Sequence, residues 1–256
     1  MLPKVSIIMN CHNGEKYLKK SISSVINQTY KNWELIFWDN KSTDRSEKIF
    51  KDFKDKRLRY FKSKNYFKLY KARNKAIKKC RGKFIAFLDT DDWWLKKKIQ
   101  KQVYILEKNQ SIPLIYSNWI VYNQKKKLKK IFNNSKLPSG KISQSLLDKY
   151  QINIGTVMIK KSILKKFNFN ENYEIIGDFD LFIKLSLKYM FLSIQEPLSY
   201  YRLHDNNFSR KYSLHASELE SWIKKNQSIL KRKKINISNQ IHYLYKLKIK
   251  NFINYK

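Results

Sequence analysis

The first half of the chain alternates short apolar segments with longer segments in which apolar residues recur at helical spacing. Four nearly continuous apolar runs are predicted to be strands, at residues 5–9, 35–38, 58–61 and 84–88. Three segments between them are predicted to be amphipathic helices, at residues 15–27, 43–53 and 66–79. Apolar strands that alternate with helices indicate a parallel sheet covered by helices on both faces. The pattern therefore predicts an α/β fold.

The second half of the chain has a less regular pattern. Strands are predicted at residues 114–122 and 156–159, and a polar, lysine-rich loop is predicted over residues 123–141. A helix is predicted at residues 178–188, and a last strand-like segment ends near residue 201. From residue 214 onward, apolar residues recur at helical spacing among many lysines, with an interruption near residues 233–238. This C-terminal segment is predicted to be a basic amphipathic helical extension.

Polar side chains cluster where three of the predicted strands end. The clusters lie at residues 10–13, 39–44 and 89–92. In open α/β sheets, ligands bind beyond the carboxyl ends of the parallel strands. These three clusters therefore predict a ligand site at one edge of the sheet.

The third cluster contains three carboxylates within four residues, in the order Asp89, Thr90, Asp91 and Asp92. Adjacent carboxylates repel one another unless a cation neutralises them. Mg²⁺ prefers oxygen ligands and uses one or two carboxylates together with substrate phosphates. The cluster is thus a candidate bridge between a metal ion and a diphosphate. An acidic turn that caps the following helix would leave the same pattern.

The formal net charge of +35 has two explanations. A basic surface attracts polyanions such as nucleic acid, anionic lipid headgroups or the diphosphate of a sugar nucleotide. Alternatively, Lys, Asn, Ile, Tyr and Phe are enriched together in proteins from AT-rich genomes, and the lysines here occur in every segment. No helix-turn-helix, zinc-finger or RNA-recognition motif is visible. A nucleic-acid-binding protein is therefore a remote alternative, and no nucleic-acid partner is expected.

Length and hydrophobic content limit the class of protein. A chain of 256 residues with 42% hydrophobic residues can bury one sizeable core. Cys11 and Cys80 show neither metal-binding nor redox spacing, which fits reduced thiols in a cytoplasmic protein. The N-terminal apolar run is too short for a signal peptide, and nowhere do 18 apolar residues run together to span a membrane.

The motifs and their order resemble family 2 glycosyltransferases, which are inverting enzymes of the GT-A fold. The opening strand and turn (residues 5–18), the end of the first helix (24–30) and the loop 39–44 match motifs of this family. Ala72-Arg73-Asn74 and residues 87–94 match the next two motifs. The resemblance covers roughly residues 4–205 and is most specific in the first hundred. It implies a Rossmann-like, mostly parallel sheet with helices on both faces.

The resemblance assigns nucleotide and metal contacts to residues of this chain. Asp39 would hydrogen-bond the nucleobase, which we expect to be uracil, and Arg73 would lie beside the nucleotide. Asn10 and Asn13, from the first polar cluster, are further candidates for nucleotide contact. Metal ligands, for Mn²⁺ or Mg²⁺, are expected in the acidic turn and in a later Tyr-Arg-x-His motif, at Asp91, Asp89 and His204. Asp89 would contact either the metal or the ribose of the nucleotide.

The resemblance also assigns the catalytic base to Asp178. This residue would remove the proton of an acceptor hydroxyl as that oxygen attacks the anomeric carbon in line. A carboxylate at a helix N-terminus is also a good cap, which is the structural alternative. Four positions depart from the family pattern: Asn40, Lys41, Ala76 and Gly177. Gly177 replaces a Glu before the expected base, which removes a carboxylate near the acceptor.

Together these features predict an inverting, metal-dependent glycosyltransferase that moves a sugar from a nucleotide-sugar donor to a glycan or lipid-linked acceptor. Residues 1–110 are expected to form the nucleotide-sugar half, 111–212 the acceptor half and 213–256 the basic tail. The expected role is bacterial surface polysaccharide synthesis in the cytoplasm, with the tail as a candidate contact with the anionic inner face of the plasma membrane. The alternatives are a nucleotidyltransferase and a non-catalytic partner subunit.

Overall fold

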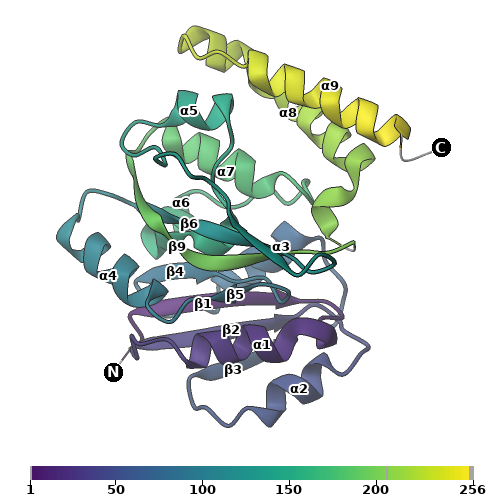
Figure 1. Ribbon diagram of the computed structural model, residues 1–256. Coiled ribbons are helices and arrows are strands. Elements are labelled where there is room, and N and C mark those ends of the chain that lie inside the picture. The colour runs from purple at the N-terminus through teal and green to yellow at the C-terminus, as the bar shows by residue number, and fades with distance from the viewer. Residues whose placement is uncertain (1, 206, 254–256) are drawn as a thin grey trace.

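The structure, a computed structural model, describes residues 2–205 and 207–253. Within these residues, nine strands form one mixed sheet between two layers of helices (Figure 1). Along the sheet the strands follow the order β3-β2-β1-β4-β8-β6-β9-β5, and β7 pairs with β6 outside this path. The chain thus has the layered α/β architecture that the sequence predicts.

The first four strands form a parallel half-sheet. They are β1 (Val5–Cys11), β2 (Trp33–Asp39), β3 (Leu58–Lys62) and β4 (Phe84–Phe87). Three helices connect them: α1 (Glu15–Ile26), α2 (Ser46–Asp52) and α3 (Leu69–Ile77). These strands and helices confirm the elements predicted for the first 90 residues. Because parallel strands end at the same edge, Asn10, Asp39 and Asp89 all lie near that edge.

Two apolar cores cover the two faces of the sheet. On one face, α1, α2 and α4 (Lys98–Lys108) pack against residues such as Ile7 and Leu35. On the other face, α3, α7 (Gly177–Ser186) and α8 (Tyr212–Arg232) pack against residues such as Ile8 and Ile36. Alternate residues of β1 and β2 therefore face different cores, which explains the continuous burial of these strands.

The second half of the sheet is mixed. Its strands are β5 (Trp93–Trp94), β6 (Leu114–Asn123), β7 (Leu128–Ile131), β8 (Met158–Lys160) and β9 (Phe191–Leu203). β8 runs antiparallel to β4 and β6, whereas β6 and β9 run parallel with a register shift near Asn118. The antiparallel β8 therefore joins the parallel half to the β6–β9 pair.

The structure corrects two boundaries of the sequence prediction. The segment predicted as a loop, residues 123–141, contains β7, whose four residues are all exposed and carry no apolar alternation. The strand predicted at residues 156–159 begins instead with a 3-10 turn, η1 (Ile154–Thr156), and the strand β8 follows it. In η1 the Asn153 side chain accepts a hydrogen bond from the Gly155 N–H, which stabilises the turn over an extended start.

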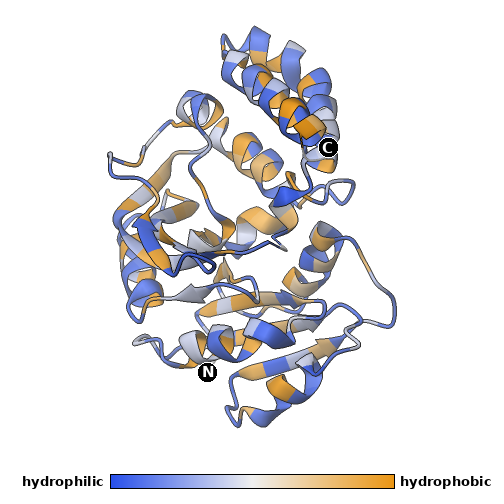
Figure 2. Ribbon diagram, turned by 45° about the vertical axis from the view of Figure 1, so that its right-hand side comes forward, coloured by the Kyte–Doolittle hydropathy of each residue, from blue (hydrophilic) through white to orange (hydrophobic). Residues whose placement is uncertain are grey.

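The C-terminal extension is helical as predicted, and its first helix belongs to the core. α8 buries Leu219 and Trp222, and α9 (Ser238–Ile253) runs alongside α8 after a break at residues 233–237 (Figure 1). Figure 2 shows hydrophilic and hydrophobic residues interleaved along both helices. No helix in the described ranges is long and apolar enough to cross a membrane. The shorter elements are α5 (Ser143–Asp148), α6 (Lys161–Lys166) and η2 (Phe208–Arg210).

Candidate active site

A cavity of about 520 Å³ opens at the carboxyl ends of the parallel strands. Asn10 at the end of β1 and Arg73 of α3 line one part of it. Asp89 and Asp91 follow β4, and Asp178 at the start of α7 also lines the cavity. Five of the residues singled out in the sequence thus meet around one cavity. Its size is typical of a small-molecule site.

The three carboxylates of the acidic turn have different partners. The Asp89 Oδ1 atom lies 2.7 Å from the Arg73 guanidinium, and the Asp91 Oδ2 atom lies 3.0 Å from His204 Nε2. Asp92 is buried and accepts a hydrogen bond from the Arg202 backbone N–H at 2.7 Å. Burial and its two acidic neighbours raise the pKa of Asp92 well above its usual value. Asp92 therefore fixes the turn, whereas Asp89 and Asp91 remain partly exposed to the cavity.

The acidic turn and His204 partly match the expected metal site. Asp91 and His204 are in contact, although they are 113 residues apart in the chain. Asp89 is held by Arg73, and within residues 2–205 and 207–253 no three His, Cys, Asp or Glu side chains gather closely enough to hold a metal ion. Oxygen ligands from one or two carboxylates, completed by substrate phosphates, are nevertheless the usual set for Mg²⁺. The residues present fit an ion held jointly with a diphosphate.

The Asp178 side chain is half-buried, and its surroundings have opposing effects on its pKa. Burial raises the pKa of Asp178, whereas the nearby Arg73 guanidinium and the Tyr70 hydroxyl lower it. The Tyr70 hydroxyl lies 2.9 Å from Asp178 Oδ1 and 2.8 Å from the Ile175 carbonyl oxygen. The Tyr150 hydroxyl is buried and lines the same cavity, and burial and the charge of Asp178 raise the pKa of Tyr150. Asp178 thus has a raised pKa, as a general base requires.

The position of Tyr70 explains why residue 177 is a glycine. A Cβ atom placed on Gly177 would lie 2.4–2.6 Å from atoms of the Tyr70 ring. The ring therefore occupies the space into which a side chain at position 177 would extend. The carboxylate that the resemblance expects at this position is replaced by a phenol, and the Tyr70 hydroxyl contacts Asp178 directly.

The start of α7 is fixed by a carboxylate from α8. The Glu218 side chain accepts hydrogen bonds from the backbone N–H groups of Glu174, Ile175 and Ile176, at 2.6, 2.9 and 3.1 Å. These N–H groups precede the first turn of α7, where a negative charge also interacts favourably with the helix dipole. The C-terminal helix α8 therefore holds the segment that presents Asp178.

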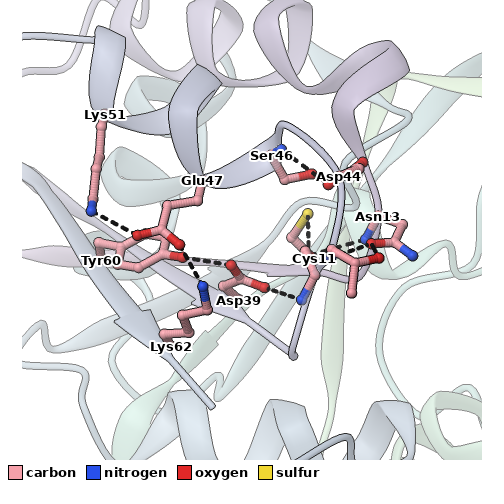
Figure 3. A network of polar contacts seen from close by, with 11 residues as sticks. Cys11, Asn13, Asp39, Asp44, Ser46, Glu47, Lys51, Tyr60 and Lys62 are labelled. Atoms are coloured by element: carbon pink, nitrogen blue, oxygen red, sulfur yellow. Dashed lines mark hydrogen bonds and ion pairs between the residues drawn. The ribbon is translucent and has the colours of Figure 1, made fainter. Parts of the chain in front are cut away.

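Asp39 is fully buried and lies behind the cavity wall. Its carboxylate accepts hydrogen bonds from the Tyr60 hydroxyl and from the Ser42 backbone N–H, the latter at 2.7 Å. Figure 3 shows Asp39 beside Tyr60, with Asn13 and Asp44 on the neighbouring loops and Ser46 at the start of α2. Burial and the Asp39 carboxylate raise the pKa of Tyr60. The nucleobase contact expected of Asp39 stays a prediction, since Asp39 does not line the cavity.

Two neighbouring loops explain where the Asn13 side chain lies and why Asn40 and Lys41 differ from the family pattern. The Asn13 Oδ1 atom accepts a hydrogen bond from the Thr43 N–H, so Asn13 joins the loops and does not line the cavity. Asn40 both donates to and accepts from the Phe67 backbone, a pairing that a carboxylate in its place could not complete. Lys41 has a φ of +64°, the region that favours the glycine of the family motif.

Asn10 carries an independent sign of a ligand. Both side-chain polar atoms of Asn10 are buried and have no hydrogen-bond partner among the described residues. Unsatisfied buried amides are rare in folded proteins and require an explanation. Because Asn10 lines the cavity, a polar ligand group would satisfy it.

Sequence reasoning missed Tyr70 and Tyr150 as neighbours of Asp178. Tyr70 precedes Arg73 by three residues in α3, and this spacing places both side chains on one helix face. That spacing could have indicated Tyr70. No comparable pattern marks Tyr150, which reaches Asp178 only through the packing of the segment after α5.

Solved structures share this architecture and identify the fold. TarS of S. aureus, residues 1–349 with UDP-GlcNAc, matches with a TM-score of 0.65 and 15% identity, over 97% of this chain and 72% of that chain. The mannosyltransferase PcManGT from Pyrobaculum calidifontis, with GDP-Man and Mn²⁺, matches with a TM-score of 0.66 and 13% identity, over 95% and 70%. The fold is the GT-A fold of glycosyltransferases that use nucleotide-sugar donors.

Sequence comparison identifies the family. The family model for glycosyl transferase family 2 matches residues 6–167. An Escherichia coli protein named UDP-Glc:alpha-D-GlcNAc-diphosphoundecaprenol beta-1,3-glucosyltransferase is 33% identical over 225 residues, which are 85% of this chain and 79% of that protein. The chain belongs to glycosyl transferase family 2, which confirms the resemblance noted in the sequence.

Proposed function

We propose that this protein transfers a sugar from a UDP-sugar to a hydroxyl group of a lipid-linked glycan, with inversion at the anomeric carbon. The observation that carries the proposal is that a half-buried carboxylate, Asp178, lines the same cavity as Arg73, Asp89 and Asp91. A base and a set of groups suited to a diphosphate therefore face one space. The names of the E. coli relative and of the TarS complex, which include UDP-Glc and UDP-GlcNAc, support the choice of donor.

In the proposed reaction, an acceptor oxygen attacks the anomeric carbon while Asp178 takes the proton of that hydroxyl. The new bond joins the acceptor oxygen to the anomeric carbon, and the bond from that carbon to the diphosphate oxygen breaks. Arg73 lies between Asp89 and the base, where its cation lowers the pKa of Asp178. A single displacement of this kind turns an α-linked donor into a β-linked product.

The leaving diphosphate needs positive charge near it. Asp91 and Asp89, with His204 beside Asp91, would hold Mn²⁺ or Mg²⁺. Such an ion, when bound, stabilises the negative charge that develops on the nucleoside diphosphate. The Mn²⁺ in the PcManGT complex supports this assignment.

The name of a relative supports the choice of acceptor, and the basic tail supports the proposed cellular location. The E. coli relative is named for a GlcNAc acceptor on diphosphoundecaprenol. A lipid-linked acceptor of this kind is presented at a membrane surface. The proposal therefore places the protein at the cytoplasmic face of the plasma membrane, in the synthesis of a surface polysaccharide. As part of the same proposal, residues 1–110 bind the donor, residues 111–212 help to bind the acceptor and residues 213–256 form the membrane-facing tail.

The test combines product analysis with one substitution. The protein is incubated with a panel of UDP-sugars, Mn²⁺ and a short-chain alkyl-diphosphate GlcNAc, and UDP release and the anomeric configuration of the product are measured. Asp178→Asn should lower transfer by about 10²–10⁴-fold, the usual contribution of a general base. UDP should still raise the melting temperature of this variant, because donor binding does not need the base.

Asp52→Asn, at an exposed carboxylate of α2, is the matched control and should transfer at the wild-type rate. A product with retained configuration, or full activity in excess EDTA, would contradict the inverting or the metal-assisted part of the proposal. UDP binding without release from any donor would favour the non-catalytic partner. Formation of a sugar nucleotide from a nucleoside triphosphate and a sugar phosphate would favour a nucleotidyltransferase.

A further inference from the structure

A second cavity, of about 540 Å³, lies on the other side of Asp178. It is enclosed by the segment after α5, the start of α7 and the helices α8 and α9, which lie together above the sheet (Figure 1). Tyr150, Ile175 and Asp178 line both this cavity and the one at the strand ends. The base is therefore accessible from two directions.

Two substrates must meet at the base in a single displacement. The acceptor oxygen attacks from the side opposite the leaving diphosphate, so the two substrates approach Asp178 from different directions. The groups suited to a diphosphate leaving group, Arg73, Asp89 and Asp91, line the first cavity and not the second. Each cavity has a volume typical for one ligand. The second cavity is thus positioned for the acceptor.

The lining of the second cavity combines apolar and basic side chains. Ile176, Phe179 and Leu219 are buried, and Lys149, His242 and Lys246 are exposed. Such a surface suits an amphiphile with a negatively charged group between a sugar and an apolar chain.

The two lysines of this cavity are available to an anion. Neither Lys149 nor Lys246 has a carboxylate partner in the described part of the chain, whereas Lys248 on another face of α9 pairs with Glu220 at 3.1 Å. Besides Asp178, the lining contains one further acid, Asp148, which accepts a hydrogen bond from Gln144 at 2.8 Å. An anionic ligand at Lys149 and Lys246 would therefore meet positive charge that is not already paired.

α9 connects this cavity to the outer surface of the tail. Residues 242, 243 and 246 of α9 line the cavity. The adjacent face of the helix carries Tyr245 and Ile249, whose exposed fractions are 60% and 59%. An apolar chain that leaves the cavity along α9 would reach this face next.

We propose that the second cavity is the acceptor site and that it takes a glycan carried on a lipid diphosphate. The sugar hydroxyl lies at Asp178, and the diphosphate lies against Lys149 and Lys246. This assignment rests on the proposed transfer reaction, and it adds the site of the acceptor and the groups that select its class.

The test measures binding by the full chain in the presence of UDP and Mn²⁺, without vesicles. The two probes are an alkyl-diphosphate GlcNAc and the same alkyl GlcNAc without the diphosphate. Lys149→Glu and Lys246→Glu should each weaken binding of the diphosphate probe by about tenfold, since a charge reversal near a diphosphate changes the interaction by more than 1 kcal/mol. Binding of UDP and of the uncharged probe should stay unchanged.

Lys225→Glu is the matched control, because Lys225 is an exposed lysine of α8 outside the cavity. The inference is overturned if the wild type does not bind the diphosphate probe, or if the control weakens binding as much as the cavity variants. Equal affinity of the wild type and the variants for both probes overturns it as well. Failure of the proposed function would look different, because UDP binding or UDP release would then be lost in the wild type itself.

Discussion

At the scale of single residues, the ionisation of one carboxylate depends on its burial and on two neighbours. Burial raises the pKa of Asp178, and Arg73 and Tyr70 oppose this rise. Tyr70 also fills the space beside Gly177. Tyr70 therefore both excludes a side chain at position 177 and donates a hydrogen bond to Asp178.

Tyr70→Phe should move the pH dependence of transfer. A hydrogen bond to the carboxylate favours its charged form, so removal of the hydroxyl raises the pKa of Asp178 further. A general base acts when deprotonated, and the acidic limb of the rate profile should therefore shift to higher pH. The measurement is the transfer rate between pH 5 and pH 8 with saturating donor.

Tyr60→Phe is the matched control, because the Tyr60 hydroxyl bonds to Asp39 and not to Asp178. It should leave the acidic limb where it is. An unmoved acidic limb in Tyr70→Phe would show that Tyr70 fills space without influencing the base.

The residues of the site could be predicted only in part. The positions of Asn10, Asp89 and Asp91 follow from the rule that parallel strands end at one edge of the sheet. Tyr150 could not be predicted, because its approach to Asp178 depends on packing between segments that share no local pattern. The clash that explains Gly177 likewise could not be predicted, because it depends on the position of Tyr70, 107 residues away in the chain.

At the scale of elements, α4 begins with a lysine in the core. The Lys98 side chain is fully buried, its ammonium group donates a hydrogen bond to Gln102 at 2.7 Å, and it lies 4.1 Å from the centre of the Trp94 ring. Burial lowers the pKa of Lys98 well below its usual value. Lys98 therefore binds its proton less tightly in the folded chain than in the unfolded chain.

Lys98→Met should change how stability depends on pH. Between the lowered pKa of folded Lys98 and its ordinary value near 10.5, the unfolded chain binds more protons, so wild-type stability rises with pH. The free energy of unfolding of the wild type, relative to the variant, should rise by about 1.4 kcal/mol per pH unit within this window. Urea unfolding at pH 7 to pH 10 measures the difference.

The exposed neighbour Lys97 provides the control, and Lys97→Met should follow the wild type at every pH. Parallel curves for wild type and Lys98→Met would mean that folded Lys98 keeps an ordinary pKa.

Helices and strands could be predicted from the sequence where buried apolar residues recur regularly along it. The parallel strands have continuous apolar runs because both faces are covered, and all four were predicted. α4 was not assigned, because its first turn is rich in lysine and the burial of Lys98 depends on Trp94 and Gln102. β7 was missed because it is a fully exposed edge strand that depends on β6 for its hydrogen bonds.

At the scale of the whole molecule, positive charge and exposed apolar residues coincide on α9. Tyr245, Ile249 and Phe252 are 60%, 59% and 65% exposed, and Lys246, Lys248 and Lys250 lie between them in the sequence. Basic amphipathic helices of this kind bind anionic membrane interfaces, to which each nearby lysine contributes about 1 kcal/mol.

The double substitution Tyr245→Glu/Ile249→Glu should reduce binding to vesicles that contain phosphatidylglycerol by at least about tenfold. It removes the burial of two apolar side chains, each worth about 1.5–3 kcal/mol, and adds negative charge. Co-sedimentation at low salt measures the bound fraction. Deletion of residues 213–256 is unsuitable for this purpose, since α8 holds the start of α7 through Glu218.

Tyr104→Glu, at a tyrosine of α4 that is 58% exposed, controls for the loss of any surface aromatic residue. Equal sedimentation of the wild type, the control and the double variant would limit the tail to its structural role.

The contact between Glu218 and the start of α7 also has a consequence for biosynthesis. A ribosome makes the chain from the N-terminus, so the strands β1 to β4 and the acidic turn emerge long before α8. Until Glu218 leaves the exit tunnel, the N–H groups of Glu174, Ile175 and Ile176 lack their carboxylate acceptor. A nascent chain can therefore assemble the strand-end side of the cavity before the segment that carries Asp178 is held in place. The candidate site is complete only once α8 has been synthesised and Glu218 can bind the start of α7.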